Sequence, residues 1–187
     1  MSSQAATGGQ GVLLEPGTVR FERVLPGPIE RVWAFLTEEE KRAEWFMRAP
    51  TVVKPGGRME LRFNNSDLSP HKEPTPEKYK ECESMVSHAT VTECSPPHVF
   101  VFEWEEPTSG ASEVRFELTN EGEKVRLVLT HRRLAKREDV LGVLGGWHTH
   151  LDILVDKVSG RVPPAFWSTH AKWDAQYAAR FRDVQLV

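Results

Sequence analysis

The sequence has little of what marks an exported or membrane-bound protein. Its 187 residues include only two cysteines, Cys82 and Cys94, which allow at most one disulfide bridge. No stretch comes near the roughly 20 consecutive apolar residues of a membrane span, and the first residues lack the basic start and apolar core of a secretion signal. We therefore expect a cytoplasmic protein with free thiols and no membrane partner.

A surplus of one charge is also missing. The formal net charge is −3 and the isoelectric point is near 6.2, and acidic and basic residues are well mixed along the chain. A basic stripe that could hold nucleic acid is absent, so we expect no nucleic-acid partner.

Tyrosine is scarce, with two residues, whereas tryptophan and phenylalanine are abundant, with six and nine. Large aromatic side chains fill protein cores and also line apolar ligand pockets, so the count fits either use. At 39% hydrophobic residues, a chain of this length can bury one substantial core. One domain is the expectation.

The clearest periodic pattern runs from Asp139 to Val158. Apolar residues recur there at alternating spacings of four and three, which predicts one long helix with a single apolar stripe. The stripe consists of Val140, Leu144, Trp147, Leu151, Leu154 and Val158.

The segments before this helix alternate apolar with charged or polar residues, which predicts strands of an antiparallel sheet. We expect strands at 18–25, 58–63, 85–94, 99–105, 113–118 and 125–131. One face of such a sheet is apolar, and the long helix is expected to cover it.

The remaining segments complete an α+β fold. Residues 1–17 are expected to be a disordered tail, and 18–160 the domain. Two short helices should follow the first strand, one at 29–36 and one that Thr37 and Glu40 begin as a capping box. The polar connection 64–84 could form a lid. Aromatic residues at 166–181 predict a last helix in an extension, 161–187, which packs on the domain or forms a dimer contact.

Several of these segments together resemble the activator of heat-shock protein 90 ATPase homologues. The resemblance spans about 18–160 and rests on the first strand, Pro28 to Trp33, Leu36-Thr37, Trp45-Phe46, Pro96-Pro97, and Gly146-Trp147 before Leu151 and Leu154. That family belongs to the START-like, Bet v 1-like (SRPBCC) superfamily. The resemblance implies the helix-grip fold, in which a curved antiparallel sheet wraps around a long helix, and it implies a cavity between them.

We hypothesise that inward-facing residues of the sheet and helix line this cavity. A core packed without a cavity is the alternative interpretation. The predicted positions are Trp45, Phe46, Met59, Leu61, Phe63, Phe100, Phe102, Trp104, Phe116, Leu118, Leu127, Leu129, His131, Trp147, His150, Leu151 and Leu154.

Histidines supply the main polar candidates. His131 continues an inward-facing row and could bind a ligand or carry a proton, or it could be a satisfied core residue. His148 and His150 are two residues apart on a helix, point about 200° apart and cannot share one metal ion. We expect both to be partly exposed, with His150 near the cavity edge. The spacing of Cys82, His88 and Cys94 does not match a zinc site, so no metal is expected.

Charged residues give a weaker signal. Glu93, Glu103 and Glu105 could serve acid–base chemistry, but alternation places the last two on the charged face of the sheet. Arg132-Arg133 and Lys136-Arg137 could form a basic mouth for an anion, although a solvated turn before the helix explains them more simply.

Binding of a small hydrophobic or aromatic molecule is the function that these patterns favour. One alternative is a protein-interaction module that stimulates an ATPase of the heat-shock protein 90 type. A second is a polyketide-cyclase-like enzyme centred on His131 and His150. We identify no catalytic constellation, expect no cofactor, and leave open a monomer or a homodimer.

Overall fold

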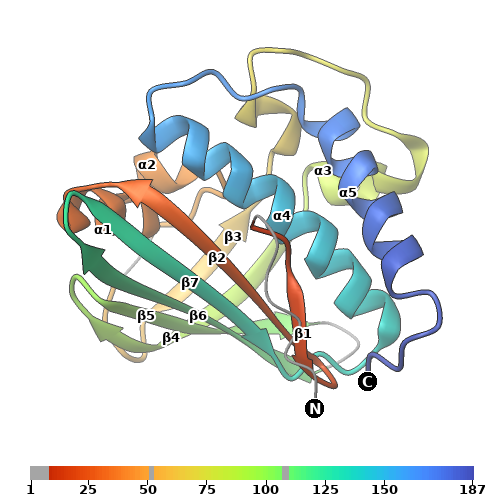
Figure 1. Ribbon diagram of the computed structural model, residues 1–187, viewed down its shortest axis with the longest axis horizontal. Helices are drawn as coiled ribbons and strands as arrows, with labels where there is room; N and C mark the ends of the chain where they lie inside the picture. Colours follow the sequence, from red (N-terminus) through yellow and green to blue (C-terminus); the bar gives the residue numbers. More distant parts are fainter. Residues whose placement is uncertain (1–8, 51–52, 107–109) are drawn as a thin grey trace.

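The computed structural model describes residues 9–50, 53–106 and 110–187 and has an α+β architecture (Figure 1). The described residues form seven strands, five α-helices and two short 3₁₀ helices. In chain order they are β1 (Val12–Glu15), β2 (Thr18–Pro26), α1 (Ile29–Thr37), α2 (Glu39–Ala43), β3 (Arg58–Arg62), η1 (Asn65–Leu68), η2 (Glu77–Tyr79), α3 (Lys80–Glu83), β4 (Val86–Ser95), β5 (Val99–Glu106), β6 (Gly110–Glu121), β7 (Lys124–Arg132), α4 (Arg137–Val158) and α5 (Phe166–Arg180).

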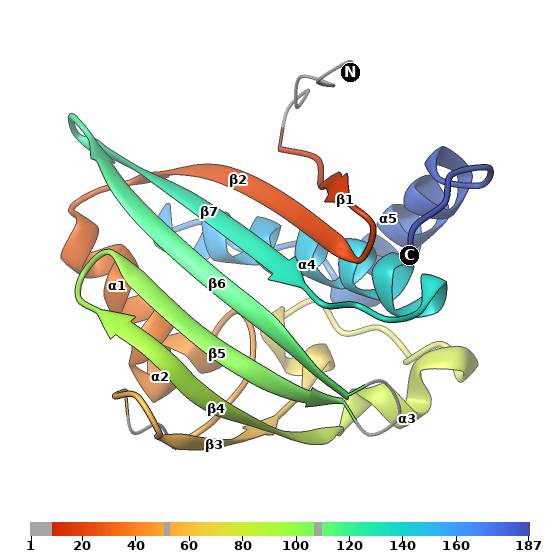
Figure 2. The same ribbon diagram turned by 90° about the horizontal axis from the view of Figure 1, so that it is seen from below.

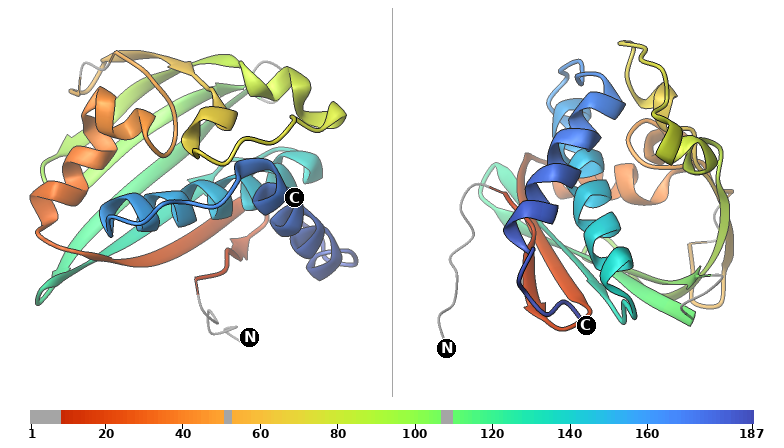
Figure 3. Two further views of the ribbon diagram at one scale, coloured as in Figure 1. Left: turned by 90° about the horizontal axis from the view of Figure 1, so that it is seen from above. Right: turned by 90° about the vertical axis from the view of Figure 1, so that its right-hand side faces the viewer.

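The strands form one antiparallel sheet in the order β1-β2-β7-β6-β5-β4-β3. The sheet is strongly curved, and its concave face is turned toward α4 (Figures 2 and 3). Phe116 pairs with Leu129 and Leu118 with Leu127, so the predicted inward row continues from one strand to the next. The helix-grip fold that the sequence indicated is therefore confirmed.

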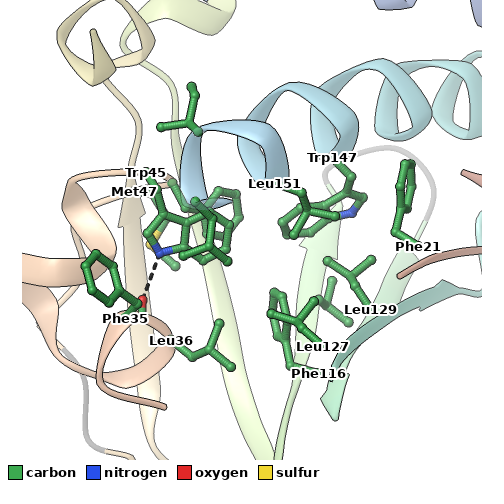
Figure 4. Close-up of a cluster of buried hydrophobic side chains, with 14 of the residues drawn as sticks. Phe21, Phe35, Leu36, Trp45, Met47, Phe116, Leu127, Leu129, Trp147 and Leu151 are labelled. Atoms are coloured by element: carbon green, nitrogen blue, oxygen red, sulfur yellow. Dashed lines mark hydrogen bonds between the residues drawn. The ribbon is translucent and has the colours of Figure 1, made fainter. Parts of the chain in front are cut away.

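Helix α4 packs its apolar stripe on the concave face. All six predicted stripe residues are buried, which confirms the stripe, although the helix begins two residues earlier than expected. Figure 4 shows Trp147 and Leu151 pointing from α4 toward Phe116, Leu127 and Leu129 of the sheet. None of the helices in the described ranges combines the length and apolar composition needed to cross a membrane.

The short helices α1 and α2 cover the neighbouring part of the concave face. Trp45 follows them, is fully buried, and donates a hydrogen bond from Nε1 to the Phe35 carbonyl at 2.8 Å (Figure 4). The predicted capping box is wrong, because Thr37 is the last residue of α1 and donates its hydroxyl to the Trp33 carbonyl. Helix α2 begins after Glu38, which makes no side-chain cap.

The predicted N-terminal tail is wrong for residues 12–15, which form strand β1 and pair with β2. The Gly11 amide donates to the Tyr177 hydroxyl at 2.6 Å, and the Gly17 amide donates to the Leu186 carbonyl at 2.7 Å. These partners come from the far end of the chain, so the polar composition of the segment could not reveal them. Residues 1–8 lie outside the described residues.

Helix α5 packs across α4 (Figure 3), and its Tyr177 also bonds the Gly11 amide before β1. The Trp173 ring stacks on His148 with ring centroids 3.5 Å apart, and Tyr177 hydrogen-bonds the same imidazole at 2.7 Å. The Arg137 guanidinium donates to the Phe181 carbonyl at the end of α5. The aromatic side of α5 is thus turned toward α4.

We predict that Tyr177→Phe releases β1 from the domain. The change leaves the Gly11 amide and His148 Nδ1 unpaired in a buried place, which should lower the free energy of unfolding by about 1–3 kcal/mol in urea denaturation. Hydrogen exchange at the Gly11 amide should accelerate. Tyr79→Phe is the matched control and should leave this amide protected. Unchanged protection of Gly11 in Tyr177→Phe would show that β1 is held in another way.

Candidate functional site

A pocket of about 290 Å³ lies between α4, α5 and the connection formed by residues 64–84. We call it the α4–α5 pocket. Its volume is at the lower end of the range for small-molecule sites. The lining residues are Phe46, Phe63, Asn65, Tyr79, Cys82, Met85, Trp104, Gly142, Val143, Gly146, Trp147, His150, Phe166, Trp167, His170 and Asp174.

The pocket has room partly because two of the α4 residues that line it are glycines, which have no side chain. Gly142 and Gly146 are four residues apart and therefore lie on one side of the helix. A Cβ atom at either position would meet no other atom within 4 Å. Gly145 differs, because a Cβ there would lie 3.4 Å from the Asp174 Cα of α5. One glycine thus lets two helices approach closely, and two others leave space.

Aromatic rings from the sheet side form the floor of the pocket. The Phe63 and Trp104 rings are stacked, with centroids 5.7 Å apart and an interplanar angle of 8°. Phe46 lies beside Trp147 at 4.8 Å. These rings are continuous with the buried core beneath α4, so the pocket is an open end of that core.

The 64–84 connection closes one side of the pocket and is fastened to α5. Asp174 Oδ2 accepts hydrogen bonds from the Tyr79 hydroxyl at 2.6 Å and from Lys78 Nζ at 2.7 Å. Trp167 Nε1 donates to Ser66 Oγ at 2.9 Å, and the Tyr79 ring stacks on Trp167. The polar connection, which joins β3 to β4, therefore forms short helical turns, and these turns cover the pocket.

Five of the predicted cavity residues line this pocket: Phe46, Phe63, Trp104, Trp147 and His150. The other twelve point inward as expected but are buried in the packed core and do not line it. They are Trp45, Met59, Leu61, Phe100, Phe102, Phe116, Leu118, Leu127, Leu129, His131, Leu151 and Leu154. Strand alternation identifies the inward face, but it cannot show that α4 and Trp45 fill most of the space above it.

His131 is a satisfied core residue. Trp147 Nε1 can only donate, and it lies 3.0 Å from His131 Nδ1, so Nδ1 accepts and the proton is on Nε2, which donates to Ser112 Oγ at 2.8 Å. Complete burial lowers the pKa of His131 to about 3. Both ring nitrogens are therefore occupied by protein groups.

The expectation that His148 and His150 are partly exposed is wrong, since their exposed fractions are only 3% and 6%. They do lie on different sides of α4. His148 is covered by α5, which the periodicity of α4 alone could not reveal. His150 Nδ1 lies 2.9 Å from the Trp45 carbonyl, which only accepts, so Nδ1 carries the proton and Nε2 presents a lone pair. Burial lowers the pKa of His150 to about 4.

None of the charged candidates lines the pocket, and the three glutamates form ion pairs with arginines. Glu103 pairs with Arg133 at 2.6 Å, Glu105 with Arg58 at 2.9 Å and Glu93 with an arginine of β6 at 2.7 Å. Arg132 forms a further exposed pair with a glutamate of β6. The described residues contain no group of three or more metal-binding side chains.

Sequence reasoning missed the wall contributed by the connection and by α5. Those residues are Asn65, Tyr79, Cys82, Met85, Phe166, Trp167, His170 and Asp174. Met85 begins the predicted strand 85–94, and the others fall in the predicted connection 64–84 and extension 161–187. Contacts between these two segments join positions about a hundred residues apart in the chain. The one local signal was the pair Gly142 and Gly146 inside a helix, where glycine is unfavourable.

A protein family and a solved structure are similar to this chain over most of its length. A family model described as Activator of Hsp90 ATPase homolog 1-like protein matches residues 26–159. A solution structure from Bordetella parapertussis is 43% identical with a TM-score of 0.79 and covers 96% of this chain and 95% of that chain. The comparison with curated proteins gives no significant match.

Two more distant solved structures share the fold alone. CalU16 from Micromonospora echinospora is 18% identical with a TM-score of 0.68, over 92% of this chain and 98% of that chain. The Aha1 dimer from Colwellia psychrerythraea is 16% identical with a TM-score of 0.59, over 75% of this chain and 95% of that chain.

The buried histidines predict a loss of stability in acid. Their pKa values fall from near 6.5 in the unfolded chain to about 3 for His131 and His148 and about 4 for His150. Their contribution is fully present above pH 6.5 and is lost as the pH falls toward the folded values, because only the unfolded chain then takes up the protons. Each histidine should contribute about 1.4 kcal/mol per pH unit in this window.

Urea denaturation between pH 7 and pH 4 checks this prediction. His131→Asn keeps an acceptor for Trp147 and removes one titrating group. The slope of its unfolding free energy against pH should therefore be smaller by about 1.4 kcal/mol per pH unit, which corresponds to one proton. The exposed His71→Asn is the matched control and should keep the slope of the unmodified protein. Equal slopes for all three proteins would contradict the assignment of His131 as a neutral core residue.

Proposed function

The chain belongs to the Activator of Hsp90 ATPase homolog 1-like family and has its helix-grip fold, and on this premise we propose that it binds a small aromatic molecule in the α4–α5 pocket. One observation carries the proposal. The pocket is walled by aromatic rings, and Gly142 and Gly146 of α4 leave open space beside them. Flat apolar ligands are what such a space accommodates.

Burial of an apolar ligand supplies the free energy of binding. Each Å² of apolar surface removed from water contributes about 25 cal/mol, and ring-on-ring contacts add to this. The Phe63, Trp104 and Trp147 rings already contact one another edge to face or in stacks. A planar ligand placed against them extends the same arrangement into the empty space.

The 64–84 connection offers a route of entry. Neither η2 nor α3 contains a buried residue, and this part of the connection is joined to α5 by the exposed Lys78 and the half-buried Tyr79. Segments with few buried contacts open at low free-energy cost. Release of these bonds to Asp174 would uncover the pocket while the sheet and α4 stay in place.

A cyclase-type enzyme is less well supported. That hypothesis needs His131 and His150 to act together inside one cavity, but His131 is bonded to Trp147 and Ser112 and does not line the pocket. Stimulation of a chaperone ATPase rests on the family description alone.

We predict that the pocket can be filled by mutation. Naphthalene should raise the melting temperature of the unmodified protein, since a ligand of the native state stabilises it by mass action. Gly146→Leu places a side chain in the empty space and should weaken binding more than about tenfold. Folding should not suffer, because glycine is the poorer helix former by up to about 1 kcal/mol.

Gly146→Ala is the matched control for this variant. It gains the same helix propensity but occupies little of the pocket, so it should still bind naphthalene in calorimetric titration. Unchanged binding to Gly146→Leu, or no binding to the unmodified protein across a broad set of apolar aromatic compounds, would contradict the proposed function.

The two cysteines allow a second prediction within one molecule. Cys82 lines the pocket, whereas Cys94 lies in β4 outside it. A saturating aromatic ligand should slow alkylation of Cys82 by iodoacetamide and leave the rate at Cys94 unchanged, as followed by peptide mass spectrometry. Equal protection of both thiols would indicate a general stabilisation, and protection of neither would place the ligand elsewhere.

A further inference from the structure

Building on the proposed function, we infer that the ligand is a neutral aromatic compound with a hydroxyl group, and that Asn65, His150 and His170 hydrogen-bond this hydroxyl. The three residues line the α4–α5 pocket. They come from η1, α4 and α5, so they belong to three different walls.

His150 contributes a fixed acceptor. Its Nδ1 hydrogen is used by the Trp45 carbonyl at 2.9 Å, which leaves Nε2 as a lone pair, and no described residue donates to it. The side chain is 94% buried, because its exposed fraction is 6%. A neutral imidazole held in this tautomer can accept a hydrogen bond from a ligand hydroxyl at Nε2.

Asn65 and His170 each hold a buried polar atom without a partner. Asn65 Oδ1 and His170 Nδ1 make no hydrogen bond with any described residue, although the exposed fractions of the two side chains are only 8% and 9%. An unpaired buried polar atom is costly, and such atoms are rare in native proteins. Rotation of the Asn65 amide, or a change of tautomer in His170, lets either group meet a hydroxyl as donor or acceptor.

The three groups are gathered around the same aromatic pair. The Phe166 ring is near both histidines, with centroids 5.3 Å from His150 and 5.8 Å from His170. The adjacent Trp167 donates to Ser66, the residue next to Asn65. A ring bound against Phe166 and Trp167 would therefore bring its substituent to this polar group.

The charge of the lining residues favours a neutral ligand. Asp174 is the one charged side chain among the described residues that line the pocket. Burial lowers the pKa of His150 to about 4 and lowers that of His170, so both imidazoles are neutral near pH 7. A carboxylate would find no cation within the pocket and would lie near the Asp174 carboxylate.

Calorimetric titration with four naphthalenes tests the inference on the unmodified protein. 1-Naphthol should bind about tenfold more tightly than naphthalene or 1-methoxynaphthalene, which have the same rings but no donor. The anion 1-naphthoate should bind no more tightly than naphthalene. Equal binding of 1-naphthol and naphthalene would overturn this inference and leave the proposed function standing. No binding of any probe would overturn both.

Conservative variants then test the residues. His150→Asn keeps an N–H that can reach the Trp45 carbonyl but has no acceptor at the Nε2 position, and Asn65→Leu removes the amide at similar volume. Each should reduce the preference for 1-naphthol over naphthalene to about twofold, while naphthalene binding is retained. Asn65→Leu should also raise the melting temperature of the free protein by about 2–4 °C, because an unpaired buried group is removed.

His71→Asn is the control variant, because His71 is exposed on the same connection and does not line the pocket. Its preference for 1-naphthol should equal that of the unmodified protein. An undiminished preference in both His150→Asn and Asn65→Leu would overturn the assignment of these residues.

Discussion

The contact between α4 and the concave face of the sheet is the interaction on which the rest of the structure depends. Seven strands about 4.8 Å apart span about 29 Å, whereas a helix with its side chains is only about 10–12 Å wide. One helix cannot cover such a sheet. Helices α1 and α2 with Trp45 cover one neighbouring part, and the 64–84 connection, which is fastened to α5, lies over another. The α4–α5 pocket lies where these covers meet and where Gly142 and Gly146 add no side chain.

The packed part of the molecule and the pocket differ in the hydrogen bonding of their buried polar groups. In the packed part, His131 is bonded to Trp147 and Ser112, and the Trp45 indole is bonded to the Phe35 carbonyl. Along the pocket, Asn65 and His170 hold polar atoms for which the described residues supply no partner. His131 and Trp45 are satisfied by protein groups, whereas Asn65 and His170 have polar atoms that a bound molecule could pair, and this contrast supports the proposal of a ligand.

The sequence predicted the fold because the fold follows from local periodicity. Alternation in the strands placed Phe102 and Phe116 inward, and the spacing on the long helix placed Leu151 against them. The wall of the pocket was not predictable in this way, because Tyr79 and Asp174 meet across 95 residues of chain. The same limit applies to β1, because the segment before this strand is bonded to Tyr177, far away in the sequence. Glycine within α4 was the available sign that one side of this helix faces open space.

We infer that an aromatic molecule occupies the α4–α5 pocket and not the packed core beneath α4. Intermolecular nuclear Overhauser effects between unlabelled 1-naphthol and the isotope-labelled protein test it most directly. The account predicts contacts from the naphthol ring protons to the Hα atoms of Gly142 and Gly146 and to the Tyr79 ring. Contacts to Leu127 and Phe116 instead, or contacts spread over the outer face of the sheet, would contradict it.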